Sequence, residues 1–131
     1  MAEIYIRLSG DGFKPSVLSE RIGLPIEIIS ETGVIAKRGK YKGKPSPHGM
    51  GIIDISIPDI SINTLVGVYS ARLYDWKKIL HELYVDDITI GINTFGLEYE
   101  LDFGFRLLGD LASMKIGLEI HNGGTTVPKT I

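Results

Sequence analysis

The clearest candidate for chemistry is a cluster of cations near the middle of the chain. Five lysines and arginines fall within eight residues with a tyrosine among them, namely Lys37, Arg38, Lys40, Tyr41, Lys42 and Lys44. Such a cluster can bind a phosphate backbone, a nucleotide or an acidic protein surface. It is not a phosphate-cradling P-loop, because the pattern Gly-x-x-x-x-Gly-Lys-Ser/Thr is absent. The alternative is a solvated loop that its lysines keep soluble.

A second candidate is formed by polar residues that alternate with apolar ones along predicted strands. Successive side chains of a strand point to opposite faces, so these polar residues would share the outer face of a sheet. The residues singled out on that face are Tyr5, Arg7, Asp54, Glu98, Glu100, Glu119 and His121. The face would be mainly acidic and would suit a basic protein partner. The alternatives are the solvated side of an antiparallel sheet and a face covered by a second copy of the chain.

Three further groups of residues are weaker candidates, and structural roles explain them better. His121 could pair with Glu119 as an acid and base, but no nucleophile pattern accompanies them. Asp86 and Asp87 could ligate a hard cation, although they stand where turn residues are expected. Asp11 lies in a glycine-rich turn before a short helix, where its charge would repel an anion. We therefore expect no catalytic residue, no metal site and no cofactor.

The composition of the chain restricts the classes of protein to which it can belong. The chain has 131 residues, no cysteine and a net charge of −2, which excludes disulfides and thiolate chemistry and makes nucleic acid an unlikely partner. Without the five clustered cations the rest of the chain would carry −7, so the charge is segregated. No apolar run is long enough to span a bilayer, and no signal segment is visible, so a cytoplasmic protein is expected.

The elements that would position these residues follow from the periodicity. Period-two alternation predicts strands over 3–8, 28–37, 52–57, 87–94, 96–101 and 115–121. Helices are predicted over 15–22, from Ser70 as an N-cap to Leu83, and over 103–114 with Asp102 as a cap. Residues 60–68 are either a connector or the first turn of the second helix. Glycines and prolines predict a long exposed loop over 38–51.

These elements predict an α+β fold. It consists of two layers, with an antiparallel-dominated sheet of five or six strands and about three helices on one face. Residues 1–122 would form one domain, followed by a loose tail over 123–131. Within the third helix, Phe105, Leu108, Leu111 and Ala112 are expected to point inward. The predicted core includes Ile4, Ile6, Leu8, Leu18, Ile55, Leu73, Trp76, Leu80, Ile90, Ile92, Leu108, Leu111 and Leu118.

Two stretches of the chain share a layout with a known family. After the first strand come Ser9-Gly10-Asp11-Gly12-Phe13-Lys14-Pro15, then Leu18 and Ile22-Gly23-Leu24-Pro25; near the end, a helix over 107–114 precedes Lys115-Ile116-Gly117-Leu118-Glu119-Ile120. This pattern resembles a bacterial family known as domain of unknown function 4279. The resemblance implies an α+β domain without known chemistry, in a family some of whose members are suspected immunity proteins. It carries over no functional residue.

The functional expectation is a small cytoplasmic protein-binding module. It could be an immunity protein or another inhibitor that recognises its partner by complementary charge. The alternative is a binder of a small ligand, a nucleotide or a polyanion through residues 37–44. A homodimer is a further possibility, and no membrane partner is expected.

Overall fold

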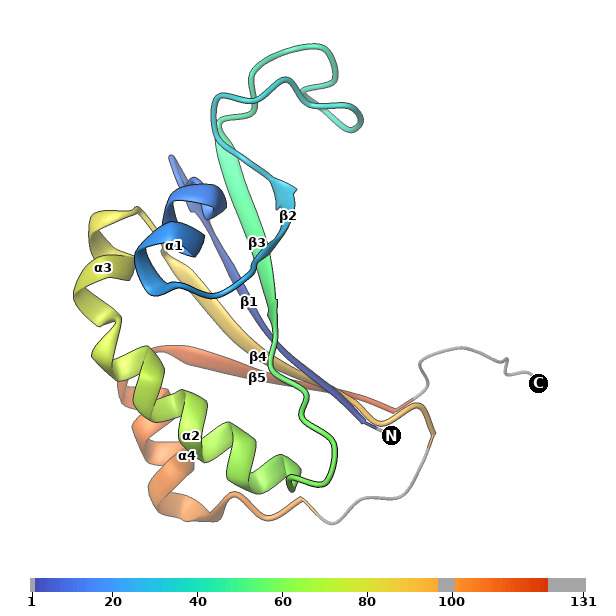
Figure 1. Ribbon diagram of the computed structural model, residues 1–131, viewed down its shortest axis with the longest axis vertical. Coiled ribbons are helices and arrows are strands. Elements are labelled where there is room, and N and C mark those ends of the chain that lie inside the picture. The colour runs from blue at the N-terminus through green and yellow to red at the C-terminus, as the bar shows by residue number, and fades with distance from the viewer. Residues whose placement is uncertain (1, 97–100, 123–131) are drawn as a thin grey trace. The chain divides into compact units, whose positions relative to one another are not determined.

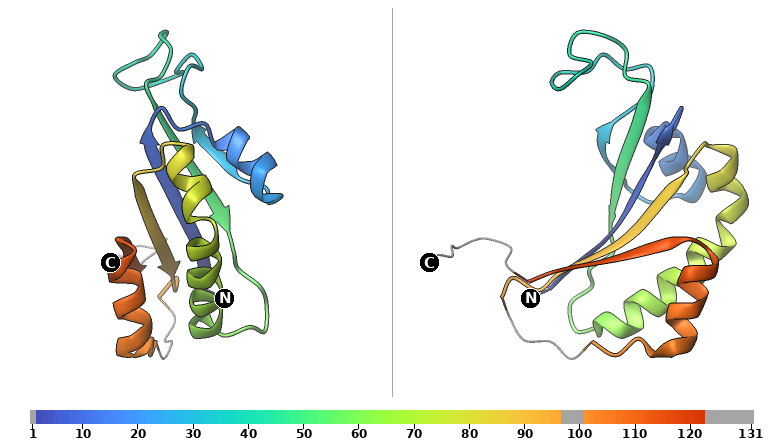
Figure 2. Two further views of the ribbon diagram at one scale, coloured as in Figure 1. Left: turned by 90° about the vertical axis from the view of Figure 1, so that its left-hand side faces the viewer. Right: turned by 180° about the vertical axis from the view of Figure 1, so that it is seen from behind.

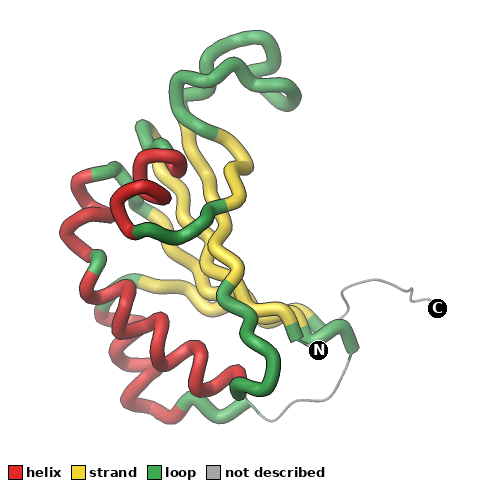
Figure 3. The backbone as a smooth tube through the Cα atoms, in the orientation of Figure 1, coloured by secondary structure: helices red, strands yellow, loops and turns green. Residues whose placement is uncertain are grey.

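A computed structural model describes residues 2–96 and 101–122, and within them the chain is α+β with five strands and four helices (Figure 1). The strands are β1 (Glu3–Asp11), β2 (Glu27–Ser30), β3 (His48–Asp54), β4 (Asp87–Asn93) and β5 (Ile116–His121). The helices are α1 (Pro15–Ile22), α2 (Ile62–Asp75), α3 (Lys77–Glu82) and α4 (Gly104–Ser113). Figure 3 shows how loops separate these elements. The predicted fold class is confirmed.

The strands form one mostly antiparallel sheet in the order β2-β3-β1-β4-β5. β2 is antiparallel to β3, with Glu27 opposite Ile52 and Ile28 opposite Gly51. β5 is the exception, because its carboxyl end meets that of β4, where the Thr94 N–H donates to the His121 carbonyl at 2.9 Å. The two strands therefore run in the same direction (Figure 2). A helical crossover through α4 suits such a parallel pair.

Two predictions concern residues that the description does not include. The predicted strand over 96–101 falls mainly on residues 97–100, and the predicted tail covers 123–131. Both lie outside the described residues. In the part that is described, no helix is long and apolar enough to cross a membrane.

The chain divides into two compact units, which are described separately below. Unit 1 comprises residues 1–6, 54–74 and 89–131, and unit 2 comprises residues 7–53 and 75–88. The formal net charges of the two units have opposite signs. Unit 2 has ten lysines and arginines against eight aspartates and glutamates, whereas unit 1 has four against eight.

In unit 2, the short helix α1 packs against its neighbouring elements. α1 spans the predicted residues because Pro15 suits its first turn and Gly23 ends it in the left-handed conformation. α1 contacts both β2 and α3 (Figure 1). The buried hydrophobic side chains of the unit are Leu8, Phe13, Leu18, Ile53 and Leu80.

The predicted loop over 38–51 was too long, because its last four residues belong to β3. Gly49 and Gly51 lie inside this strand rather than in a turn. A Cβ atom on Gly49 would overlap the carbonyl oxygen of Phe13, and one on Gly51 would come within 2.6 Å of Ile26. These glycines therefore allow close packing, a role that the sequence does not distinguish from turn formation.

Unit 1 is packed mainly by aliphatic side chains from helices and strands. Its buried hydrophobic residues are Ile4, Ile6, Ile55, Ile62, Leu65, Val66, Leu73, Ile90, Ile92, Leu111 and Ile116. The prediction that α2 begins at Ser70 was wrong, because the helix begins at Ile62 and Ser70 is buried within it. The Ser61 side chain instead accepts a hydrogen bond from the Thr64 N–H at 3.1 Å, as an N-cap does.

The orientation of α4 also differs from the prediction. Leu111 is buried as expected, but Phe105 is 88% exposed and Leu108 is 45% exposed. Ala112 is exposed as well. α4 contacts β5 and buries Leu111, whereas Leu107 is half-buried and the remaining apolar side chains of the helix are exposed. Of the predicted core, Trp76 and Leu118 are half-buried and the remaining members except Leu108 are buried.

Candidate functional site

The cation cluster lies on a hydrogen-bonded excursion between β2 and β3, here called the basic arm (residues 33–46), which extends beyond both strands (Figure 1). The two sides of the arm are joined by backbone hydrogen bonds. The Gly33 N–H donates to the Ser46 carbonyl at 2.8 Å, and the Ala36 N–H donates to the Lys44 carbonyl at 2.9 Å. Gly39 has a φ of 84° near the tip, a conformation that glycine adopts without strain. The arm therefore has a defined backbone.

All the predicted binding residues of the arm are exposed, namely Lys37, Arg38, Lys40, Tyr41, Lys42 and Lys44. No carboxylate in residues 2–96 and 101–122 forms an ion pair with any of these five cations. The Lys40 ammonium lies 5.5 Å from the centre of the Tyr41 ring. Their positive charge is therefore available to an external partner.

Exposed apolar side chains accompany the cations. Val34 and Ile35 in the arm are each 54% exposed, and Ile28 and Ile29 in the preceding strand β2 are 49% and 50% exposed. These side chains add exposed apolar surface at and next to the basic arm. The predicted strand over 28–37 is too long, because β2 ends at Ser30. Period-two alternation does not indicate that these side chains face solvent.

The residues predicted for the polar sheet face lie in differing environments. The Tyr5 ring lies against Gly91, where a Cβ atom would overlap it, so Tyr5 is half-buried. Asp54 is exposed and accepts a hydrogen bond from the Ser56 N–H at 2.9 Å. Arg7 is half-buried in β1, and its side chain has an interaction partner. Glu98 and Glu100 lie outside the described residues.

Glu119 and His121 come together as the sequence suggested. The His121 Nε2 lies 3.2 Å from the Glu119 Oε1, at the carboxyl end of β5. About half of each side chain is accessible, at 53% and 38%, so solvent screens the interaction. The pair is a surface ion pair when His121 is protonated.

A second histidine–carboxylate pair was not predicted from the sequence. The His48 Nδ1 lies 3.0 Å from the Asp11 Oδ1, which links the start of β3 to the end of β1. Ser46 forms a tight turn at the same place, because its hydroxyl donates to the His48 carbonyl at 2.8 Å. A prediction that β3 begins at His48 would have placed His48 next to the end of β1, and therefore next to Asp11. Within the described residues, no three histidine, aspartate or glutamate side chains form a group that could hold a metal ion.

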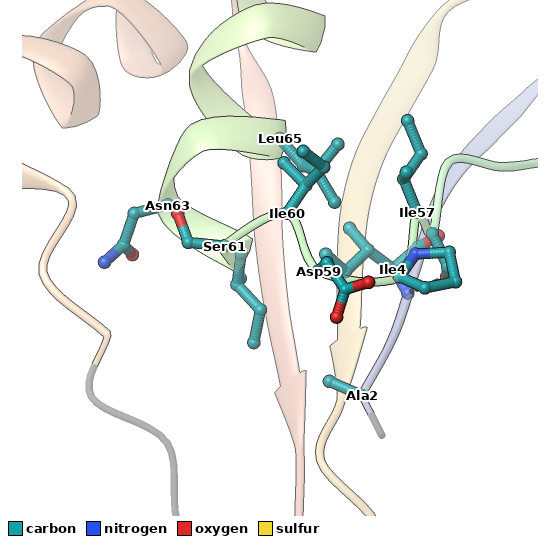
Figure 4. Close-up of a pocket in the computed structure, with 11 residues that line it drawn as sticks. Ala2, Ile4, Ile57, Asp59, Ile60, Ser61, Asn63 and Leu65 are labelled. Atoms are coloured by element: carbon teal, nitrogen blue, oxygen red, sulfur yellow. Dashed lines mark hydrogen bonds between the residues drawn. The ribbon is translucent and has the colours of Figure 1, made fainter.

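Unit 1 contains a hollow of about 240 Å³ beside the turn that precedes α2 (Figure 4). Its lining is mostly apolar and includes Ile4, Ile57 and Leu65. Among the described residues that line it, Asp59 carries the only charge, and its backbone has a φ of 69°. The hollow is smaller than typical small-molecule sites, which start near about 300 Å³. It is a weaker candidate than the basic arm.

No family model, curated protein or solved structure matches the chain. The resemblance to the bacterial family of unknown function therefore stays a prediction. The basic arm combines cations that form no ion pair with a described carboxylate, exposed apolar side chains and a hydrogen-bonded backbone.

Proposed function

We propose that the protein is a protein-binding module that docks an acidic partner through its basic arm. The observation that carries the proposal is the set of five cations that form no ion pair with the described carboxylates, displayed on a hydrogen-bonded backbone. Complementary charge steers a partner and fixes its orientation. A hydrogen-bonded arm also loses less conformational entropy on binding than an unstructured loop would.

The exposed apolar residues favour a protein over a nucleic acid as the partner. Val34 and Ile35 offer area that an apolar patch on a protein can cover, whereas a phosphate backbone gains little from them. The net charge of −2 also opposes general binding to nucleic acid. An inhibitor or immunity protein is the finer role that we propose. A cytoplasmic location is part of this proposal, because a chain without cysteine needs no oxidising compartment to fold.

One observation favours a second candidate, the binding of a nucleotide or polyanion. Tyr41 is 38% exposed, and the Lys40 ammonium lies close to its ring. An exposed aromatic ring between cations can stack on a base while lysines contact the phosphates. This mode of binding would use Tyr41 and the cations but not Ile35.

The experiment measures binding of two labelled probes with equal negative charge. One is a peptide in which glutamate and leucine alternate, and the other is oligothymidylate. We expect the peptide to bind more tightly, and the double variant Lys40→Glu/Lys42→Glu to weaken its binding about ten- to a hundredfold. The matched control Lys14→Glu/Lys78→Glu changes the net charge equally at exposed positions outside the arm and should have a much smaller effect.

Ile35→Ser separates the two candidates. A protein-binding arm loses affinity for the peptide, whereas a polyanion site retains its affinity for oligothymidylate. Failure of both probes to bind at physiological ionic strength would contradict the proposal. Equal losses in the arm variant and in the control would also contradict it, because the arm would then contribute nothing beyond net charge.

A further inference from the structure

The strand β2 forms an edge of the sheet, and no described strand pairs with its outer side. β3 occupies the inner side, and α1 contacts β2 from in front of the sheet and not from beside it (Figures 1 and 2). Ile28 and Ile29 are 49% and 50% exposed, and Glu27 is exposed as well. The outer side of β2 is therefore accessible to another molecule.

Backbone groups of β2 lack a partner among the described strands on this side. Neighbouring residues of a strand direct their N–H and C=O groups to opposite sides, so an edge strand presents an unpaired row of these groups. A bulge adds to this row, because the ladder passes from Ile28 opposite Gly51 to Ser30 opposite Met50 and leaves Ile29 without a partner in β3. Such groups can pair with an extended segment of another chain.

The charges along this edge change sign from one end to the other. Glu27 stands at the beginning of β2, whereas the basic arm follows the end of β2 and leans over its outer side (Figures 1 and 2). The Glu31 carboxylate, which lies between them in the sequence, accepts a hydrogen bond from the Ser16 N–H at 2.7 Å and is thereby directed toward α1. A segment laid along β2 would meet the two exposed isoleucines and then the five cations of the arm.

We propose that β2 binds an extended acidic segment of the partner as an additional antiparallel strand. The inference rests on the proposed function of the basic arm and specifies how the partner is held. Antiparallel ladders are slightly more stable than parallel ones. In that orientation the residues next to the arm precede those next to the isoleucines, so acidic residues come first in the segment and apolar ones follow. The backbone supplies hydrogen bonds, and the side chains supply specificity.

The charge of the arm favours this occupant over a second copy of the chain. If two β2 strands paired antiparallel, each arm would meet residues 23–27 of the other copy, which carry a single carboxylate, that of Glu27. Five cations would then lack a matching number of negative charges. β2 is also short and bulged, two features that limit indiscriminate pairing between edges, so we expect the charge of the arm to select the segment.

The first test compares two labelled peptides of identical composition. One has a run of glutamates followed by alternating valine and threonine, and the other has the same residues in reverse order. We expect the peptide with its glutamates first to bind at least about tenfold more tightly at physiological ionic strength. Ile29→Glu places a charge against the valines and should weaken this binding about tenfold. The matched control Val68→Glu, at an exposed position of α2, should not weaken it.

The second test examines the backbone of the bound peptide. Residues of an added strand direct their N–H groups alternately toward β2 and away from it. N-methylation of alternate peptide residues should therefore abolish binding in one register and leave it nearly unchanged in the other. Equal effects of the two sets overturn strand addition, and tighter binding of the reversed peptide overturns the antiparallel orientation.

The remaining outcomes separate this inference from the proposed function. Equal binding of both peptides that is lost in Lys40→Glu/Lys42→Glu but unaffected by Ile29→Glu overturns strand addition and leaves the proposed function standing. Failure of both peptides to bind contradicts both. We expect the protein alone to sediment as a monomer, and a dimer that Ile29→Glu dissociates would assign the edge to a second copy and overturn the inference. Ile29 is exposed, so the variant should fold, and thermal melting will check this.

Discussion

The two units differ in how they achieve close packing and in what they expose. Among its described residues, unit 1 buries eleven hydrophobic side chains, and most of them come from β1, α2 and β4. Unit 2 buries five, and its strands approach neighbouring backbone at glycines such as Gly49. Close backbone contacts at glycines therefore contribute to the packing of unit 2, whereas unit 1 depends mainly on side-chain volume.

The units also expose apolar surface of different kinds. Unit 2 exposes Val34 and Ile35 among cations, whereas unit 1 exposes Phe105 and Leu108 on a helix with balanced charges. Apolar surface surrounded by one sign of charge suits a partner of the opposite charge. The comparison therefore supports a partner of stated charge only for the basic arm, as we propose.

The largest effect is expected from Gly49→Ala in unit 2. A Cβ atom at this position would overlap the Phe13 carbonyl oxygen, so the backbone must shift, at a cost of about 3 kcal/mol in the free energy of unfolding. Denaturant unfolding measures it. The control is Gly67→Ala in α2, where no atom lies within 4 Å of the new Cβ, and it should stabilise by about 0.5–1 kcal/mol. Equal effects of the two substitutions would remove the packing contrast between the units.

The next effect tests side-chain packing in unit 1. Leu111→Ala removes a buried side chain and should cost about 2 kcal/mol, whereas Leu108→Ala should cost less than about 1 kcal/mol. Denaturant unfolding measures both values. A larger loss for Leu108→Ala than for Leu111→Ala would show that α4 is rotated relative to the orientation described here.

A smaller effect concerns the beginning of α2. Ser61→Ala removes the acceptor of the Thr64 N–H and should destabilise unit 1 by about 1 kcal/mol. Ser70→Ala lies in the middle of the helix, where alanine is the preferred residue, and should change stability by less than about 0.5 kcal/mol. The reverse order of the two values would favour a helix that begins at Ser70.

The sequence predicted the fold class and most of the core because strand periodicity is a local signal. Ile4, Ile6 and Leu8 alternate with polar residues and are all buried. The beginning of α2 was not predictable in this way, because residues 62–69 include β-branched residues and a glycine that weaken the helical signal. The role of Gly49 depends on Phe13, a contact 36 positions away in the chain that no local pattern records.

The residues of the candidate site could be predicted from the sequence, but the structure of the basic arm that carries them could not. The cation cluster between 37 and 44 is visible in the sequence, and all its members are exposed. The hydrogen bonds that join the two sides of the arm, and the exposure of Val34 and Ile35, depend on how β2 and β3 pair. The same limit applies to α4, since its apolar stripe predicts a buried face but does not identify which of its residues the fold covers.

The most direct test of the central claim is photo-crosslinking in the host cell from a benzoylphenylalanine placed at position 41, with position 17 on α1 as the control. If the basic arm is the binding element, one protein with an acidic surface will be crosslinked at position 41 and not at position 17. Lys40→Glu/Lys42→Glu will abolish that adduct. Absence of any protein adduct at position 41, or the same adducts at both positions and in the charge-reversed variant, would contradict the account.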